Sequence, residues 1–241
     1  MSQLISVAMI TMNEEKAVAR VIEDIRDALH GRDYEIVIVD SSRDATPSIA
    51  AGQGARVLRQ FPPQGYGRAM GRVLHESQGE VVVTLDCDGT YPAEEIPFLA
   101  DLVLSGQCDL VNASRLERRP ASMPLANYLA NWLFAVTGRL LVGVKSTDLH
   151  SGMRAYSRRV IQDVEFDPNG PALPVELLLK PALRGFRLRE VFIPYRERIG
   201  ETTLRRWSSA AWTFRRIIRL AFSRLSRRKP LNRASQQAAD L

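Results

Sequence analysis

The first half of the chain alternates short, almost wholly apolar segments with longer segments of helical character, and this alternation constrains the fold most. Strands are expected at residues 4–10, 34–39, 55–58, 80–85 and 108–113, and helices up to about residue 29, from residue 46, at 65–77 and at 92–104. Strands that are apolar along their whole length are buried on both faces, and helical connections let neighbouring strands run parallel. The sequence therefore predicts an α/β domain with a mostly parallel sheet flanked by helices.

Polar or acidic residues follow three of these strands, in the segments 9–13, 40–44 and 86–88. In open parallel sheets, ligands bind beyond the carboxyl ends of the strands. Asp86 and Asp88 lie two residues apart at such an end and can share one hard divalent cation, which can neutralise a diphosphate leaving group. The bare triplet also fits a solvated acidic turn, but its position in the sheet favours a metal site.

Three other polar segments have both a structural and a ligand-binding interpretation. Asp40 can accept hydrogen bonds from a base or ribose, or can form a turn that caps the next helix. Asn13 and Glu14 can cap the first helix or contact a nucleotide. The segment from Gly65 to Arg68 leads into a helix N-terminus, whose backbone N–H groups can bind an anion, although a plain turn has the same sequence.

Seven motifs follow one another along the chain in the order "TMNEE", "VDSSRDAT", "GYGRAM", "LDCDGTYPAEEIP", "SR", "TDLHSGMRAY" and "YRERIGETTL". From about residue 4 to 205 this series resembles the family 2 glycosyltransferases of GT-A fold, especially the dolichyl-phosphate mannose synthase and polyprenyl-phosphate glycosyltransferase branch. The resemblance implies a Rossmann-like GT-A domain. It also implies an inverting transferase that uses Mg²⁺ or Mn²⁺ to move a sugar from a nucleoside-diphosphate sugar to a polyprenyl phosphate or other lipid-linked acceptor.

The resemblance also assigns roles to individual residues. Those matching the family's nucleotide-sugar and metal–diphosphate motifs are Asn13, Glu14, Asp40, Asp86 and Asp88, with Thr90 in a supporting position at the metal. Arginines that clamp phosphate or line the acceptor site are expected at Arg115, Arg154 and Arg198. Asp148 lies in the acceptor-side loop and is the best-placed base if the acceptor is a hydroxyl, whereas a phosphate acceptor needs little help from a base.

The C-terminal region differs from the rest of the chain in charge. Ten of the 33 Lys and Arg residues lie between Arg205 and Arg233, a stretch without Asp or Glu, while 23 basic residues face 27 acidic ones elsewhere. Apolar residues recur there at three- and four-residue spacing, at Leu204, Trp207, Ala211, Phe214, Ile218, Phe222 and Leu225. A basic helix with such a stripe is typical of a helix that lies in a membrane interface. Packing of the stripe on the parent domain or on a partner subunit is the alternative.

The expected organisation is a GT-A domain over residues 1–203, a basic amphipathic helix over 204–229 and a disordered tail over 230–241. Residues 124–142 are apolar but contain Asn127, Asn131 and Arg139, which predicts a buried or surface-lying helix rather than a spanning one. Cys87 and Cys108 form no disulfide framework, and the first residues do not resemble a signal peptide. We therefore expect a cytoplasmic protein bound peripherally to the cytoplasmic face of a membrane.

An anionic membrane surface is the expected partner of the basic helix, and a membrane-embedded protein is a further candidate. Nucleic acid is not expected, since no helix-turn-helix or aromatic-platform pattern is present. Three other functions stay open at this point: a glycosyltransferase with a soluble hydroxyl or phosphate acceptor, a nucleotidyltransferase of similar fold, and a non-catalytic membrane-surface adaptor.

Overall fold

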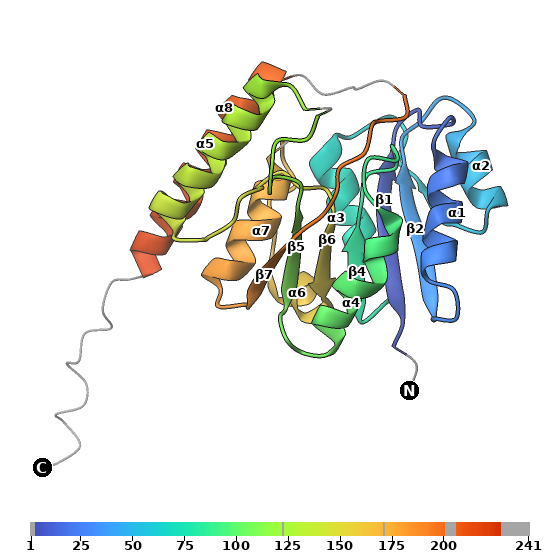
Figure 1. Ribbon diagram of the computed structural model, residues 1–241, viewed down its shortest axis with the longest axis horizontal. Coiled ribbons are helices and arrows are strands. Elements are labelled where there is room, and N and C mark those ends of the chain that lie inside the picture. Colours follow the sequence, from blue (N-terminus) through green and yellow to red (C-terminus); the bar gives the residue numbers. More distant parts are fainter. Residues whose placement is uncertain (1–2, 122, 171, 201–205, 228–241) are drawn as a thin grey trace, which may run out of the picture.

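The computed structural model describes residues 3–121, 123–170, 172–200 and 206–227 (Figure 1). Within them the strands are β1 (Ile5–Thr11), β2 (Tyr34–Asp40), β3 (Arg56–Arg59), β4 (Val81–Thr84), β5 (Leu110–Ser114), β6 (Arg154–Ser157) and β7 (Leu188–Phe192). The helices are α1 (Val18–Ala28), α2 (Thr46–Gly52), α3 (Tyr66–Glu76), α4 (Ile96–Leu104), α5 (Leu125–Val142), α6 (Arg158–Asp163), α7 (Leu173–Leu183) and α8 (Arg206–Arg227), with a 3₁₀ turn at Ala93–Glu95.

The strands form one sheet in the order β3-β2-β1-β4-β6-β5-β7. All neighbours pair in parallel except β6, which runs antiparallel to both β4 and β5. The carboxyl ends of β1, β2, β4 and β5 therefore meet at one edge of the sheet. The predicted mostly parallel α/β sheet, flanked by helices, is confirmed.

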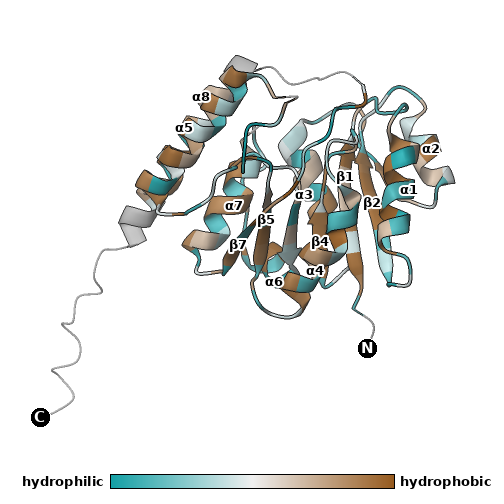
Figure 2. Ribbon diagram, viewed as in Figure 1, coloured by the Kyte–Doolittle hydropathy of each residue, from teal (hydrophilic) through white to brown (hydrophobic). Residues whose placement is uncertain are grey.

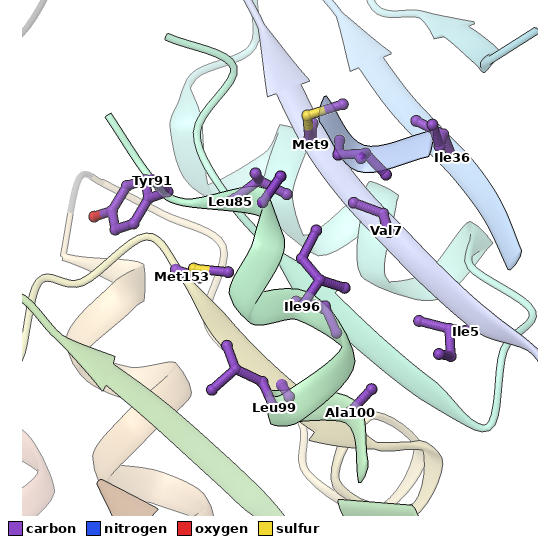
Figure 3. Close-up of a cluster of buried hydrophobic side chains, with 14 of the residues drawn as sticks. Ile5, Val7, Met9, Ile36, Leu85, Tyr91, Ile96, Leu99, Ala100 and Met153 are labelled. Atoms are coloured by element: carbon purple, nitrogen blue, oxygen red, sulfur yellow. The ribbon is translucent and has the colours of Figure 1, made fainter. Parts of the chain in front are cut away.

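Helices cover both faces of the sheet because the central strands are apolar on both sides. On one face, β1 side chains such as Val7 and Met9 belong to an apolar cluster that is built with α1 and α4. Ile96 and Leu99 of α4 are buried in this cluster (Figure 3). On the other face, Ala8 and Val82 belong to a second cluster that is built with α3, α6 and α7. These two apolar layers hold the polar strand ends in fixed positions.

Helices α5 and α8 lie side by side at the end of the sheet that carries β7, outside α7 (Figure 1). Along the part of α8 whose side chains are described, Thr213, Ile217 and Leu220 are buried against its neighbours. These residues are not the predicted stripe. Ile218 and Phe222 of that stripe are exposed instead, because α8 carries two apolar faces and packs on the other one.

The other residues of the predicted stripe differ in burial. Phe214 is half-buried, and its ring lies 5.0 Å from that of Phe134 on α5 in an edge-on arrangement. Ala211 is exposed. Leu204 and the side chains of Trp207 and Leu225 lie outside the described residues, as do the expected boundary at 203/204 and the tail over 230–241.

An ion pair fastens α8 to the domain at a buried point. Arg216, one of the ten basic residues of the C-terminal region, is only 3% exposed and pairs with the equally buried Glu176 of α7. The same guanidinium donates hydrogen bonds to the carbonyl oxygens of Asp167 (3.2 Å) and Asn169 (2.6 Å). The loop 167–170 is thereby held between α8 and the start of α3, where a Cβ on Gly67 would lie 2.1 Å from the Pro168 carbonyl oxygen.

Candidate active site

Hydrogen bonds join the ends of β1 and β2 at one edge of the sheet. The Thr11 hydroxyl donates to Asp40 Oδ2 (2.6 Å), and the backbone N–H of Asn13 donates to Ser42 Oγ (2.8 Å). Asn13 has a φ of +62°, a left-handed conformation that asparagine adopts more readily than most residues. This sharp turn leads from β1 into Glu14, whose carbonyl oxygen accepts the first hydrogen bonds of the α1 region.

Asp40 is fully buried, and both of its oxygens are engaged by protein donors. Besides Thr11, the carboxylate accepts hydrogen bonds from the backbone N–H and the hydroxyl of Ser42, and it forms an ion pair with Arg59. Arg59 was not expected from the sequence. Asp40 thus ties together the ends of β1, β2 and β3, and the predicted contact with a base or ribose requires displacement of one of these partners.

Three carboxylates, those of Glu14, Asp86 and Asp88, gather beyond the ends of β1 and β4. Burial raises the pKa of Glu14 to about 7, and the charges of Asp88 and Asp86 add to this effect while Arg198 opposes it. Burial and the neighbouring Asp88 likewise raise the pKa of Asp86. The three side chains therefore form one acidic cluster (Glu14, Asp86, Asp88) in which negative charges repel one another.

Arg198 supplies positive charge to this acidic cluster. Its Nη1 lies 2.8 Å from Asp88 Oδ2, and its Nη2 lies 3.2 Å from Glu14 Oε1. The segment after β7 is held in place by backbone hydrogen bonds from Arg196 to the Thr90 carbonyl (3.0 Å) and from Ile199 to the Asp88 carbonyl (2.9 Å). A stretch more than 100 residues away in sequence thus reaches the aspartate turn.

The donor set at this turn fits a hard divalent cation. Asp86 and Asp88 offer carboxylate oxygens, which Mg²⁺ and Mn²⁺ prefer, and their repulsion favours a bound cation. Thr90 donates its hydroxyl (2.6 Å) and backbone N–H (3.0 Å) to Asp88 Oδ1, so it orients this carboxylate. In the described part of the chain no three His, Cys, Asp or Glu side chains, those of the acidic cluster included, are arranged to hold one metal ion together, so a bound cation would need oxygens from a diphosphate or water.

Arg115 and Asp148 form a second charged unit beside the acidic cluster. Arg115 donates from Nε (2.7 Å) and Nη2 (3.0 Å) to the two oxygens of the buried Asp148, a bidentate arrangement. The guanidinium also lies over the rings of Tyr91 and Tyr195, with 5.9 and 5.2 Å to their centroids. Although burial alone would raise it, the pKa of Asp148 is lowered, because Arg115 and backbone donors stabilise the carboxylate.

Arg154 has a different place from the one expected. The side chain is 1% exposed, and Nε, Nη1 and Nη2 donate to Asn112 Oδ1, the Pro174 carbonyl and the Leu149 carbonyl respectively. A strand residue in the middle of the sheet has no solvent in reach, so its charge must be satisfied by internal acceptors. These internal contacts leave the expected phosphate contact of Arg154 without support.

Gly65 and Arg68 line a pocket of about 340 Å³ between the start of α3 and the loop 167–170. Gly65 precedes α3 with a φ of +95°, which only glycine adopts without strain. Tyr66 also lines this pocket, and burial and then the Asp86 carboxylate raise the pKa of its phenol. The loop that closes the pocket packs on α8, since a Cβ on Gly170 would lie 2.8 Å from the Trp212 ring.

Four residues of this site were given no role on the sequence, namely Arg59, Tyr91, Tyr195 and Asn112. Tyr91 and Tyr195 lie within two of the quoted motifs, three residues from Asp88 and Arg198 respectively, so a search of the flanking residues could have found them. Arg59 and Asn112 lie in none of the motifs and reach their partners only through pairing of distant segments.

Comparison with known proteins identifies this arrangement. The sequence profile described as glycosyl transferase family 2 matches residues 6–165. A dolichyl-phosphate hexose transferase of Haloferax volcanii is 42% identical over 216 residues, covering 90% of this chain and 93% of that protein. A dolichol-phosphate mannosyltransferase of Pyrococcus furiosus is 30% identical over 186 residues, covering 73% of this chain and 52% of that protein.

Among solved structures, the glucosyl-3-phosphoglycerate synthase of Mycobacterium tuberculosis in complex with Mn²⁺, UDP-glucose and glycerol 3-phosphate superposes with a TM-score of 0.70. It is 25% identical, over 93% of this chain and 80% of that one. The fold is therefore that of the GT-A class of sugar-transferring enzymes. The chain belongs to glycosyl transferase family 2.

Proposed function

We propose that the chain is an inverting, metal-dependent hexosyltransferase that moves a sugar from a nucleoside-diphosphate sugar to a polyprenyl phosphate at a membrane surface. The relatives named above support a lipid-phosphate acceptor, and the Mn²⁺ and UDP-glucose complex of the structural neighbour supports the donor and the cation. The observation that carries the choice of acceptor is the pairing of Arg115 with Asp148.

The protonation state of Asp148 distinguishes a hydroxyl acceptor from a phosphate acceptor. A hydroxyl acceptor needs a base, and Asp148 was the candidate, but its lowered pKa and its bidentate contact with Arg115 make it a poor proton acceptor. A phosphate acceptor is already anionic and needs positive charge instead. Within the described residues, Arg115 donates Nε and Nη2 to Asp148, which leaves Nη1 for a phosphate oxygen.

On the donor side, Asp86 and Asp88 would hold Mg²⁺ or Mn²⁺, with Thr90 orienting Asp88. When bound, the cation would neutralise charge that develops on the diphosphate as the sugar's C1–O bond breaks. Arg198, which contacts Asp88 and Glu14, is placed to contribute further positive charge beside the diphosphate. The pocket at Gly65 and Arg68 would receive another part of the nucleotide sugar.

A transfer assay tests this function. Purified protein is incubated with a panel of UDP- and GDP-sugars, Mn²⁺, and either a short polyprenyl phosphate or glycerol 3-phosphate as acceptor. We expect a glycosylated lipid phosphate with inverted anomeric configuration, and loss of product when EDTA removes the cation. Product from glycerol 3-phosphate alone would favour the soluble-acceptor alternative, and absence of both transfer and metal-dependent nucleotide binding would favour the adaptor.

Membrane attachment is proposed through helices α5 and α8 together. Large apolar side chains are exposed on both, namely Leu125, Leu129, Trp132, Leu133, Leu140 and Leu141 on α5 and Trp212, Ile218 and Phe222 on α8. Figure 2 shows hydrophobic and hydrophilic residues along both helices. Arginines accompany them at Arg139, Arg215 and Arg219. An apolar patch bordered by basic residues suits an anionic lipid surface. No helix in the described residues has the length and hydropathy needed to cross a bilayer.

Replacing Leu140 and Phe222 together by Ser is expected to weaken binding to anionic vesicles by about tenfold or more, since each side chain would lose its burial in lipid. These side chains are 76% and 67% exposed, so the fold should be unaffected. Phe98→Ser, a substitution of an exposed phenylalanine on α4 at the opposite face of the sheet, is the matched control. Co-sedimentation with vesicles measures the effect, and equal binding by all three proteins would contradict the attachment.

A further inference from the structure

Four polar side chains form a row across four neighbouring strands of the sheet, from β4 to the edge strand β7. Thr84 of β4 pairs in register with Arg154 of β6, Arg154 with Asn112 of β5, and Asn112 with Glu190 of β7. Residues paired in this way point to the same face of the sheet. We call Thr84, Arg154, Asn112 and Glu190 the polar row. Three of its members are buried and Glu190 is partly buried, so each needs a hydrogen-bonding partner.

One segment supplies a partner to every member of the row, namely residues 146–152 between α5 and β6, which we call the acceptor-side loop. At its outer end, Glu190 accepts hydrogen bonds from the backbone N–H (3.0 Å) and hydroxyl (2.7 Å) of Thr147, and from the hydroxyl of Ser146. Next along the row, Asn112 Nδ2 donates to the carbonyl oxygen of Asp148 (3.0 Å) and to Glu190 Oε2 (3.1 Å).

The inner half of the loop is held in the same manner. Arg154 Nη2 donates to the Leu149 carbonyl (2.9 Å), and the Thr84 hydroxyl donates to the Gly152 carbonyl (2.9 Å). At this end the loop touches the acidic cluster, since a Cβ on Gly152 would lie 2.7 Å from Asp86 Oδ2. Successive positions of the loop are therefore bonded to successive members of the polar row.

This arrangement fixes where the Arg115–Asp148 pair stands relative to the metal-binding aspartates. Asp148 lies in the middle of the loop and orients Arg115 through two hydrogen bonds. If Thr147 loses its anchor on Glu190, the loop keeps its inner contact at Gly152, but its outer part is held by fewer hydrogen bonds. The guanidinium would then lose its fixed orientation, and misplacement of a binding group by about 1 Å can cost on the order of 100-fold in rate.

We propose that the polar row is a template that positions the acceptor-side loop, and that Glu190, at its outer end, is a positioning residue for Arg115. The inference rests on the proposed function in that Arg115 is taken to receive the acceptor phosphate. Glu190 touches no reacting atom in this scheme. It acts through Thr147, the loop backbone and Asp148.

Glu190→Gln and Thr147→Val test the proposal in a double-mutant cycle. Each is expected to lower kcat/KM for a short polyprenyl phosphate by about 10- to 100-fold, mainly through KM, because acceptor binding is disturbed. The effect of the double variant should be clearly smaller than the sum of the two single effects, since both substitutions weaken the contact between Thr147 and Glu190. Stabilisation of the protein by nucleoside diphosphate with Mn²⁺ should not change. Asp109→Asn, which weakens a different β5–β7 link through Arg187, is the matched control and should keep the wild-type KM.

Amide hydrogen exchange gives a readout that does not depend on activity. In Glu190→Gln, residues 146–149 should exchange faster than in wild type while the core strands stay protected. Unchanged exchange in this segment, or additive effects of the two substitutions, would overturn the positioning role. If the wild type transfers no sugar to a lipid phosphate yet the loop loosens in the variant, the template stands and the proposed acceptor is wrong.

Discussion

Asp88→Asn is expected to reduce sugar transfer by at least about 100- to 1000-fold while the protein stays folded. Asparagine has the same shape and can still accept the hydrogen bonds of Thr90, but it lacks the charge that a divalent cation and Arg198 require. Loss of one charge from the acidic cluster also relieves repulsion with Asp86 and Glu14. Initial rates with Mn²⁺, measured beside thermal unfolding curves, report the two effects separately.

The control for this substitution is Asp101→Asn. Asp101 is an exposed carboxylate that pairs with Arg32 (2.6 Å) far from the strand ends, so its loss should leave transfer unchanged. A rate for Asp88→Asn within a few-fold of wild type, with cation present, would remove the central element of the proposed mechanism.

Asp148→Asn is expected to destabilise the fold by about 3–5 kcal/mol at neutral pH, because it leaves the Arg115 guanidinium buried without a counter-charge. The pKa of Asp148 is lowered in the fold, so its contribution to stability is present above the ordinary aspartate pKa and is lost as the pH falls through the lowered value. The difference between wild type and variant should thus be constant from pH 6 to 8 and shrink on acidification to about pH 4 and below.

Urea unfolding at these pH values measures the difference. Arg115→Lys is the companion variant, since it keeps the opposite charge but cannot form two parallel hydrogen bonds. We expect it to retain more stability than Asp148→Asn and to lose acceptor affinity. Equal stability of Asp148→Asn and wild type at pH 7 would contradict the buried ion pair.

The elements that could be predicted from the sequence are those with strong local signals. The strand expected at 34–39 is Tyr34–Asp40, and the apolar helix expected after Pro124 is Leu125–Val142. No elements were assigned between 154 and 192. There β6 is four residues long and begins with an arginine, α7 is apolar except for Glu176 and Lys180 and contains Pro181, and β7 is a mixed edge strand. None of these has the period that marks a strand or helix.

The site residues likewise fall into those that local sequence signals identify and those whose contacts depend on the tertiary structure. Asp86, Asp88 and Glu14 could be placed together because parallel strands bring their carboxyl ends to one edge. The contacts of Arg154 could not be inferred from the sequence, because its partners Asn112 and Pro174 become neighbours only through the pairing of strands and helices distant in the chain. A sequence motif can single out a residue such as Arg154, but the register in which the strands pair decides which groups its side chain contacts.

The burial of Arg216 between α7 and the loop 167–170 has a consequence for how such an enzyme would work on lipid. A transferase attached to the bilayer by a flexible segment adopts many heights and orientations above it. The lipid substrate can react in only some of these. Here the helix that would touch lipid is locked to the loop beside Gly67 and, through the contact between Thr213 and His150 (2.9 Å), to the segment carrying Asp148. The packing of α8 on the domain would then set the distance between the active site and the lipid headgroups.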